Sequence, residues 1–167
     1  MPIAAQVPTS LGIFTLVIDE VGLCALSFPN DTLPAAVSAT QGDIAAHPLL
    51  NEAGRQLLAY LNGTLQQFDL PLSIQGTNFQ KQVWEQLRAI PYGQTQTYGE
   101  LAEQIGGRHK ARAVGGAAHT NPLAIVIPCH RLIGANGSLT GFGGGLTMKQ
   151  ALLEREGCTI SNMKKVT

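Results

Sequence analysis

Residues that stop helices recur through the second half of the chain, and they constrain its fold more than any other feature. The stops are Pro-Tyr-Gly at 91–93, a glycine pair at 106–107 and Asn-Pro at 121–122. Proline cannot continue a helix, and glycine commonly ends one. We therefore predict short helices joined by tight turns, which excludes a coiled coil.

Three helices fit between these stops. The first begins at Thr77 or Asn78, either of which can cap it. The second begins at Thr97 and Glu100, which have the Thr-x-x-Glu spacing of a capping box. The third covers 110–118. Because a tight glycine turn separates the last two, we predict a helix-turn-helix.

Shorter periodic runs fill the first part of the chain. Apolar and β-branched residues at 12–17 and 23–28 predict a β-hairpin. The segment 29–47 has no clear period, which is typical of a surface loop. Apolar residues at three- to four-residue spacing predict a helix over 50–61, and we expect a further short strand at 70–74.

A boundary near Gly76 separates these two patterns. We expect a small α/β lobe at 1–76 and a mostly helical domain at 77–167, so the fold class is α/β. The 167 residues are 44% hydrophobic and 13% charged, as in a folded globular protein. No apolar run is long enough to span a membrane, and the first residues lack the order of a signal peptide. We therefore expect a cytoplasmic protein without a membrane partner.

Charge is unevenly distributed along a chain whose formal net charge is zero. Residues 1–103 hold nine acidic and three basic side chains, whereas residues 104–167 hold eight basic and two acidic ones. A basic second half predicts a polyanionic partner. A solvated positive face is the alternative.

The predicted third helix consists mostly of residues with very small side chains or none. Most of its residues are alanine or glycine: Ala113, Gly115, Gly116, Ala117 and Ala118. Such a helix cannot recognise base edges by hydrogen bonds, but it can approach a backbone closely, as in the DNA minor groove. Tight packing inside the core is the alternative.

Three cysteines are an odd number without Cys-x-x-Cys spacing, so neither a disulfide framework nor a zinc site is indicated. Cys24 and Cys158 fit structural positions. Cys129 differs, because it follows an apolar run at 123–127 that predicts a buried strand, and it precedes His130.

Cys129 and His130 can cooperate only if the chain turns after that strand, since neighbours on a strand point to opposite faces. Pro128 favours such a turn. A cysteine attacks as the thiolate, which forms beside a base or a positive charge. His130 offers the base and Arg131 the charge, so we predict an ionised thiol.

The run IPCHRLIGANGSLTGFGGGL at 127–146 resembles the O6-alkylguanine-DNA alkyltransferase family through its Pro-Cys-His-Arg signature. The likeness extends over about 77–157, with RAVGGA at 112–117 and Leu-Leu…Glu-Gly at 152–157. It is looser in the first part, where it rests on Thr-Ser-Leu-Gly at 9–12. The resemblance implies that the first lobe is ribonuclease H-like and mainly structural.

The resemblance assigns roles to five side chains. Cys129 is implied to accept the alkyl group, His130 to take the thiol proton through a water, and Glu156 to orient His130. Asn121 is implied to tie the third helix to the active-site strand. Tyr98 is implied to contact a phosphate and to protonate the departing guanine.

A DNA-contacting surface and a base pocket are also implied. Arg112 matches an arginine that fills the gap left by an extruded nucleotide, with a phosphate contact alone as the alternative. The other expected DNA contacts are Thr97, Tyr98, Ala113, Gly115 and Arg131. The expected base pocket comprises Phe142, Gly143, Ala118, Ala124 and Leu132. Phe142 stands where most members have tyrosine, so stacking is kept and a hydroxyl is lost, while the two alanines suggest a roomier pocket.

The implied function is direct-reversal DNA repair by single-turnover alkyl transfer to Cys129. The expected substrates are O6-alkylguanine and O4-alkylthymine in duplex DNA, with no cofactor and no metal. We expect a monomer, and cooperative binding along DNA is left open. Two alternatives remain: a DNA-binding module without chemistry, like alkyltransferase-like relatives that lack the cysteine, and a cysteine hydrolase in which Glu156 orients His130.

Overall fold

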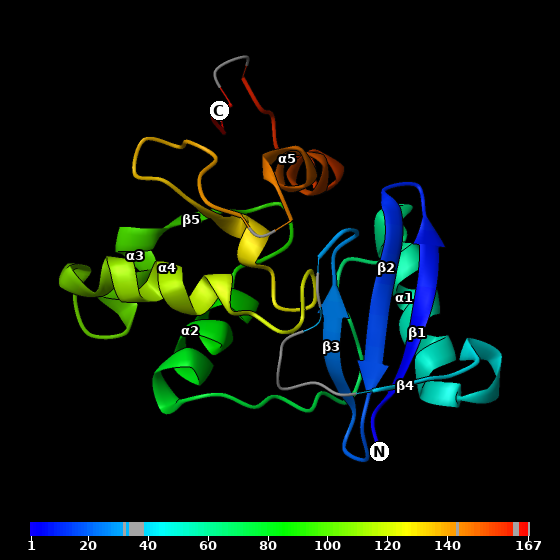
Figure 1. Ribbon diagram of the computed structural model, residues 1–167. Helices are drawn as coiled ribbons and strands as arrows, with labels where there is room; N and C mark the ends of the chain where they lie inside the picture. The colour runs from blue at the N-terminus through cyan, green and yellow to red at the C-terminus, as the bar shows by residue number, and fades with distance from the viewer. Residues whose placement is uncertain (32, 34–38, 143, 162–163, 167) are drawn as a thin grey trace. The chain divides into compact units, whose positions relative to one another are not determined.

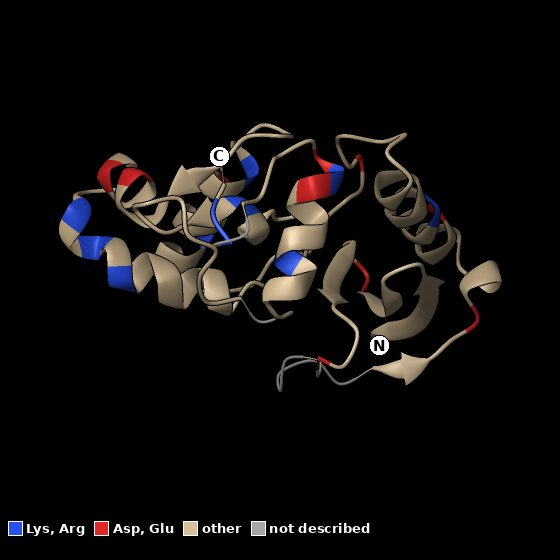
Figure 2. Cartoon of the chain, turned by 90° about the horizontal axis from the view of Figure 1, so that it is seen from above, with Lys and Arg blue, Asp and Glu red and all other residues tan. Residues whose placement is uncertain are grey.

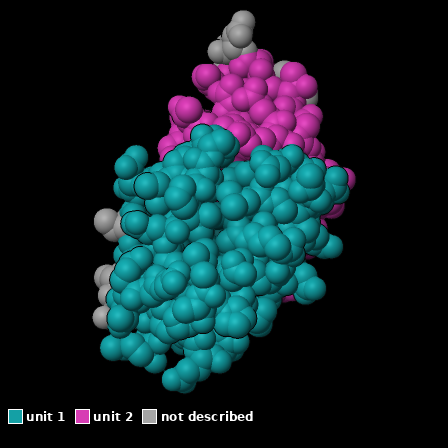
Figure 3. All heavy atoms as spheres, turned by 90° about the vertical axis from the view of Figure 1, so that its right-hand side faces the viewer, with its two compact units in different colours: residues 1–75, 122–124 teal, residues 76–121, 125–167 magenta. Residues whose placement is uncertain are grey.

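Residues 1–31, 33, 39–142, 144–161 and 164–166 are described in the computed structural model of the chain (Figure 1). The chain forms two compact units (Figure 3). One comprises residues 1–75 with 122–124, and the other comprises residues 76–121 with 125–167.

The first unit is a four-stranded sheet with one long helix. Its strands are β1 (Ile3–Thr9), β2 (Gly12–Ile18), β3 (Leu23–Ser27) and β4 (Thr40–Gln41). They lie in the order β3-β2-β1-β4, with β4 parallel to β1 and the other neighbours antiparallel. A short 3-10 helix, η1 (Ile44–Ala46), leads into α1 (Pro48–Leu61), which packs against the sheet (Figure 1). This is the predicted α/β architecture.

One strand pair of this unit was predicted from the sequence, and one strand was not. The predicted hairpin is confirmed as β2 and β3. No strand was predicted at β1, because it contains Gln6 and Pro8, and proline in particular is unusual in strands. All seven residues of β1 pair with β2. Pairing with the next strand of the chain therefore determines its conformation, against the preference of its own residues.

Two predicted strands are wrong. At 70–74 only a single bridge to β3 forms. The run 123–127 is mostly buried, but it forms no strand: Leu123 makes an isolated bridge to Leu26 of β3, Ala124 N donates to the Leu26 carbonyl at 3.1 Å, and Ile125 turns the chain with a φ of 70°. A positive φ is unfavourable for a β-branched residue, so the surrounding structure must hold this turn. The apolar run signalled burial and not strand conformation.

The second unit contains the predicted short helices. Its elements in chain order are α2 (Asn78–Arg88), β5 (Gln96–Thr97), α3 (Tyr98–Gln104), η2 (Arg108–Lys110), α4 (Ala111–His119), η3 (Cys129–Arg131), β6 (Leu132–Ile133) and α5 (Leu146–Arg155). Strands β5 and β6 pair in parallel, and α3 and α4 form the helix-turn-helix about η2. Among the described residues, no helix has both the length and the hydrophobicity that crossing a membrane requires.

Side-chain caps fix where two of these helices begin. Thr77 Oγ1 accepts a hydrogen bond from Gln80 N at 3.1 Å, and the Gln80 side chain accepts one from Thr77 N at 2.9 Å. The cap of α2 is therefore Thr77 and not Asn78. Thr97 Oγ1 accepts from Glu100 N at 3.0 Å, which confirms the predicted cap of α3.

Helix α4 is anchored on one side and bare on the other. Val114 and Ala117 are buried, and Trp84 Nε1 of α2 donates to the Ala117 carbonyl at 2.9 Å. At Gly116, no atom of the described chain lies within 4 Å of where a Cβ would stand. The two interpretations of this helix thus apply to different faces: one packs in the core and the other is open.

Candidate active site

The turn after Pro128 places Cys129 and His130 on successive positions of η3, a 3-10 helix and not a strand. Cys129 is half-buried, and its sulfur accepts a hydrogen bond from Asn121 Nδ2 at 3.2 Å. The same amide donates to the Ile127 carbonyl at 2.8 Å. Asn121 therefore links the end of the α4 segment to the segment that carries the thiol, as predicted for it.

A buried carboxylate organises the other side of this turn. Glu156 accepts from Arg131 Nε at 2.8 Å and Nη2 at 2.9 Å, and its Oε2 lies 2.7 Å from His130 Nε2. Two hydrogen bonds from a guanidinium keep the carboxylate ionised. His130 Nε2 must then carry the proton that it donates, which assigns the basic lone pair of the ring to Nδ1.

Burial sets the protonation of both reactive side chains. It lowers the pKa of His130, with Glu156 acting in the opposite direction, so the ring is neutral near pH 7. Burial also raises the pKa of the Cys129 thiol, and the Asn121 amide and the Lys149 ammonium oppose this only in part. Burial therefore favours the neutral thiol in the resting protein, in contrast to the predicted ionised one. A base must remove the proton during the reaction.

Arg131 was predicted to contact DNA, but its side chain is buried and paired inside the protein. The residue is 7% exposed, and its side chain donates to the Ile90 carbonyl at 2.7 Å as well as to Glu156. A guanidinium enclosed in this way cannot reach a phosphate in solvent. The positive charge of Arg131 is neutralised by Glu156, which also explains why it does not ionise the thiol.

Lys149 was not predicted as a site residue, although it is completely buried. Its ammonium donates to the Leu132 carbonyl at 2.5 Å and to the Thr140 carbonyl at 3.0 Å. It lies 5.7 Å from the centre of the Phe142 ring. Burial lowers its pKa to about 8, and the nearby Cys129 works in the opposite direction. In the sequence, the lack of acidic residues around this lysine was the one available signal, and it indicated a surface charge instead.

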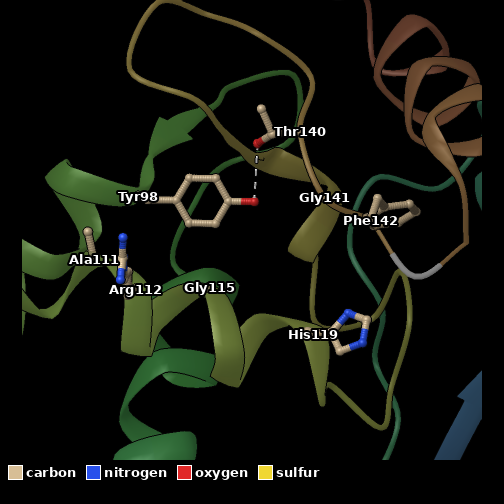
Figure 4. A pocket seen from close by; sticks show the side chains of 8 residues that line it. All are labelled: Tyr98, Ala111, Arg112, Gly115, His119, Thr140, Gly141 and Phe142. Carbon is tan, nitrogen blue, oxygen red and sulfur yellow. Dashed lines mark hydrogen bonds between the residues drawn. The ribbon is translucent and has the colours of Figure 1, made fainter.

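An open pocket of about 680 Å³ lies along α4 (Figure 4). It is lined by Tyr98, Ala111, Arg112, Gly115, His119, Thr140, Gly141 and Phe142. The predicted site supplied four of these residues. Ala111, His119, Thr140 and Gly141 were missed, although Thr140 and Gly141 fall inside the run at 127–146 that carried the resemblance.

The remaining predicted residues lie in several environments. On α4, Ala113 is exposed and Ala118 half-buried. The hydroxyl of Thr97 is engaged as the cap of α3. Ala118, Ala124 and Leu132 do not line this pocket, and the last two are buried, which corrects the assignment of all three to it. Gly143 lies outside the described residues.

Basic residues cluster along the chain at the turn between α3 and α4 (Figure 2). They are Arg108, Lys110 and Arg112, with an exposed Arg108–Glu103 ion pair at 3.4 Å. A basic turn beside a bare helix face is suited to the phosphates of a nucleic acid. Among the described residues, no group of three or more His, Cys, Asp or Glu side chains could hold a metal ion.

Known proteins resemble the chain along most of its length. The ribonuclease-like domain of 6-O-methylguanine DNA methyltransferase matches residues 5–74, and the DNA binding domain of the same family matches residues 78–158. A methylated-DNA–protein-cysteine methyltransferase of Methanosarcina acetivorans is 46% identical over 147 residues, which are 88% of this chain and 93% of that protein. A protein of the same name from Mycobacterium bovis is 57% identical over 101 residues, 60% of this chain and 61% of that protein. The crystal structure of Mycobacterium tuberculosis OGT in complex with DNA has a TM-score of 0.83 and 43% identity over 92% of each chain.

Proposed function

This chain belongs to the 6-O-methylguanine DNA methyltransferase family, and from that premise we propose that it transfers an alkyl group from O6 of guanine in duplex DNA to the sulfur of Cys129. It is thus a DNA-repair enzyme. One observation carries the assignment of Cys129: its half-buried thiol accepts a hydrogen bond from Asn121, and the next residue of η3 is a histidine whose ring contacts Glu156 at 2.7 Å.

The chemistry follows from the protonation states of these groups. His130 Nδ1 takes the thiol proton through a bound water, and the thiolate then attacks the alkyl carbon. The S–C bond forms as the C–O6 bond breaks, and the electron pair of that bond goes to guanine. Tyr98 protonates the departing guanine and regains a proton from water, while His130 returns the thiol proton to solvent. The products are guanine and S-alkylcysteine.

The alkylated guanine must leave the duplex before the Cys129 thiol can reach it, because its O6 atom is enclosed in the base stack. The pocket along α4 is of the size that encloses a small ligand, and Phe142 offers a ring on which a base can stack. Arg112 stands at the start of α4 and lines the same pocket. We propose that its side chain fills the gap that the extruded nucleotide leaves in the duplex.

The proposed reaction has further properties. The thioether formed at Cys129 is not hydrolysed by water, so each protein molecule reacts once. O4-alkylthymine carries its alkyl group on a similar exocyclic oxygen and is a second substrate. A monomeric state and a cytoplasmic location remain predictions.

The test is to mix the protein with duplex DNA that contains O6-methylguanine and to measure the intact mass of the chain. We expect a gain of one methyl group per molecule, lost in Cys129→Ser and kept in Cys158→Ser. Tight binding without a mass gain would support a DNA-binding module. Repeated product formation by an unmodified chain would support a hydrolase.

A further inference from the structure

Thr140 lies at the edge of the pocket, with two hydrogen bonds and a position next to Gly134 that limit where it can move. Its carbonyl accepts from the buried ammonium of Lys149 at 3.0 Å. Its methyl carbon Cγ2 lies 3.4 Å from where a Cβ would stand at Gly134. Its hydroxyl donates to the hydroxyl of Tyr98 at 3.5 Å, as Figure 4 shows.

These contacts together fix the direction of the Thr140 side chain. A threonine has few χ1 rotamers, and here the methyl group occupies the side next to Gly134. The hydroxyl is then directed at Tyr98. Lys149 prevents the backbone of Thr140 from shifting, since moving that carbonyl would leave a buried ammonium with one fewer acceptor.

The direction of the hydrogen bond matters for Tyr98. A phenol oxygen can accept one hydrogen bond and still donate its own proton. Either hydroxyl can rotate to donate across this distance, and the arrangement in which Thr140 donates leaves the Tyr98 proton available to a group in the pocket. When that proton leaves, the Thr140 hydroxyl remains as a donor to the negatively charged oxygen.

We propose that Thr140 is a positioning residue that aims the Tyr98 hydroxyl at the extruded base and stabilises its oxygen as the proton is given up. This inference rests on the proposed function. A separation of 3.5 Å is long for two hydroxyl groups, and hydrogen bonds of this kind tighten when a substrate is bound.

The test is a double-mutant cycle on the single-turnover rate of methyl transfer from duplex DNA, followed by intact mass. Thr140→Val keeps the shape of the side chain and removes the hydroxyl. We expect it to slow transfer about fivefold, equivalent to about 1 kcal/mol, the usual contribution of one hydrogen bond. Thr140→Ser, which keeps the hydroxyl, should stay within about twofold of the wild type. In a Tyr98→Phe background, Thr140→Val should have no further effect.

Equal slowing by Thr140→Val with and without the Tyr98 hydroxyl would overturn the inference, because the effect would not pass through that group. An unchanged rate in Thr140→Val would overturn it too. If Thr140→Val does not fold, which its thermal unfolding would reveal, Thr140→Ala takes its place in the same cycle. A wild-type chain that gains no mass would refute the proposed function itself, and this inference with it.

Discussion

Glu156 shows how one side chain can determine the state of several others. It is buried, and it accepts hydrogen bonds from His130, from Arg131 and from the Gly93 amide at 3.1 Å. An unpaired charge in such a place costs several kcal/mol, so the carboxylate and the guanidinium are stable only together. The resemblance pointed to the contact with His130, whereas the contact with Arg131 is visible only in the structure.

Glu156→Gln tests this arrangement. The variant leaves the Arg131 guanidinium buried without its counter-charge, so we expect the free energy of unfolding to fall by about 3–5 kcal/mol. Denaturant unfolding measures it. Glu154→Gln is the matched control, because Glu154 lies two residues away on the exposed side of α5 and its loss should change stability little. A similar stability of the two variants would contradict the role of Glu156.

The pH dependence of transfer tests the state of His130. Burial lowers the pKa of this imidazole below its ordinary value of 6.5, and only the neutral ring can act as the base. We expect the acidic decrease of the single-turnover rate to begin only below about pH 6.5. An acidic decrease centred above pH 6.5 would contradict a neutral, buried base.

Protonation of His130 should also lower the stability of the folded protein at acidic pH. An unfolded histidine binds a proton near pH 6.5, whereas the folded one does so only at lower pH, so the unfolded state binds more protons in between. The free energy of unfolding should therefore decrease as the pH falls through about 6.5. Circular dichroism during denaturant unfolding at pH 5.5, 6.5 and 7.5 follows this change, and His130→Gln should lack it.

Local sequence signals located most helices, and they failed where contacts with another segment determine the backbone conformation. Stop residues predicted α2, α3 and α4, because proline and glycine act on their own segment. The strand at β1 was missed because its pairing with the adjacent β2 outweighs the low strand preference of Gln6 and Pro8, and the turn at Ile125 was missed because the apolar run around it indicated a strand. The same limit applies to the site: the signature at Cys129 was visible in the sequence, but the burial of Lys149 and the direction of Thr140 depend on packing.

Arg112→Ala is the prediction that belongs to helix α4. If Arg112 fills the gap left by the extruded nucleotide, its loss should slow transfer from duplex DNA about tenfold and leave the reaction with free O6-methylguanine nearly unchanged. Arg88→Ala is the control, since Arg88 is a partly exposed arginine on α2 that does not line the pocket. Equal slowing with both substrates would exclude the gap-filling role.

The whole molecule is neutral, yet the charge available for DNA is concentrated in the second unit. Buried Arg131 and Lys149 are taken up by internal contacts, which leaves the basic turn at 108–112 as the main candidate for phosphates. Each neutralised phosphate releases counterions and adds about 0.9 to the slope of log affinity against log salt. Few such residues predict modest affinity and a shallow slope.

Salt titrations with Cys129→Ser, which cannot react, measure this slope directly. Arg108→Gln should lower it by about one. The ion pair of Arg108 with Glu103 is exposed, so it competes only weakly with a phosphate. Arg55→Gln is the matched control, because Arg55 is an exposed arginine of the first unit that pairs with Glu52. The interpretation requires that the two substitutions differ: equal effects would mean that the net charge of the protein, and not the basic turn, sets its affinity for DNA.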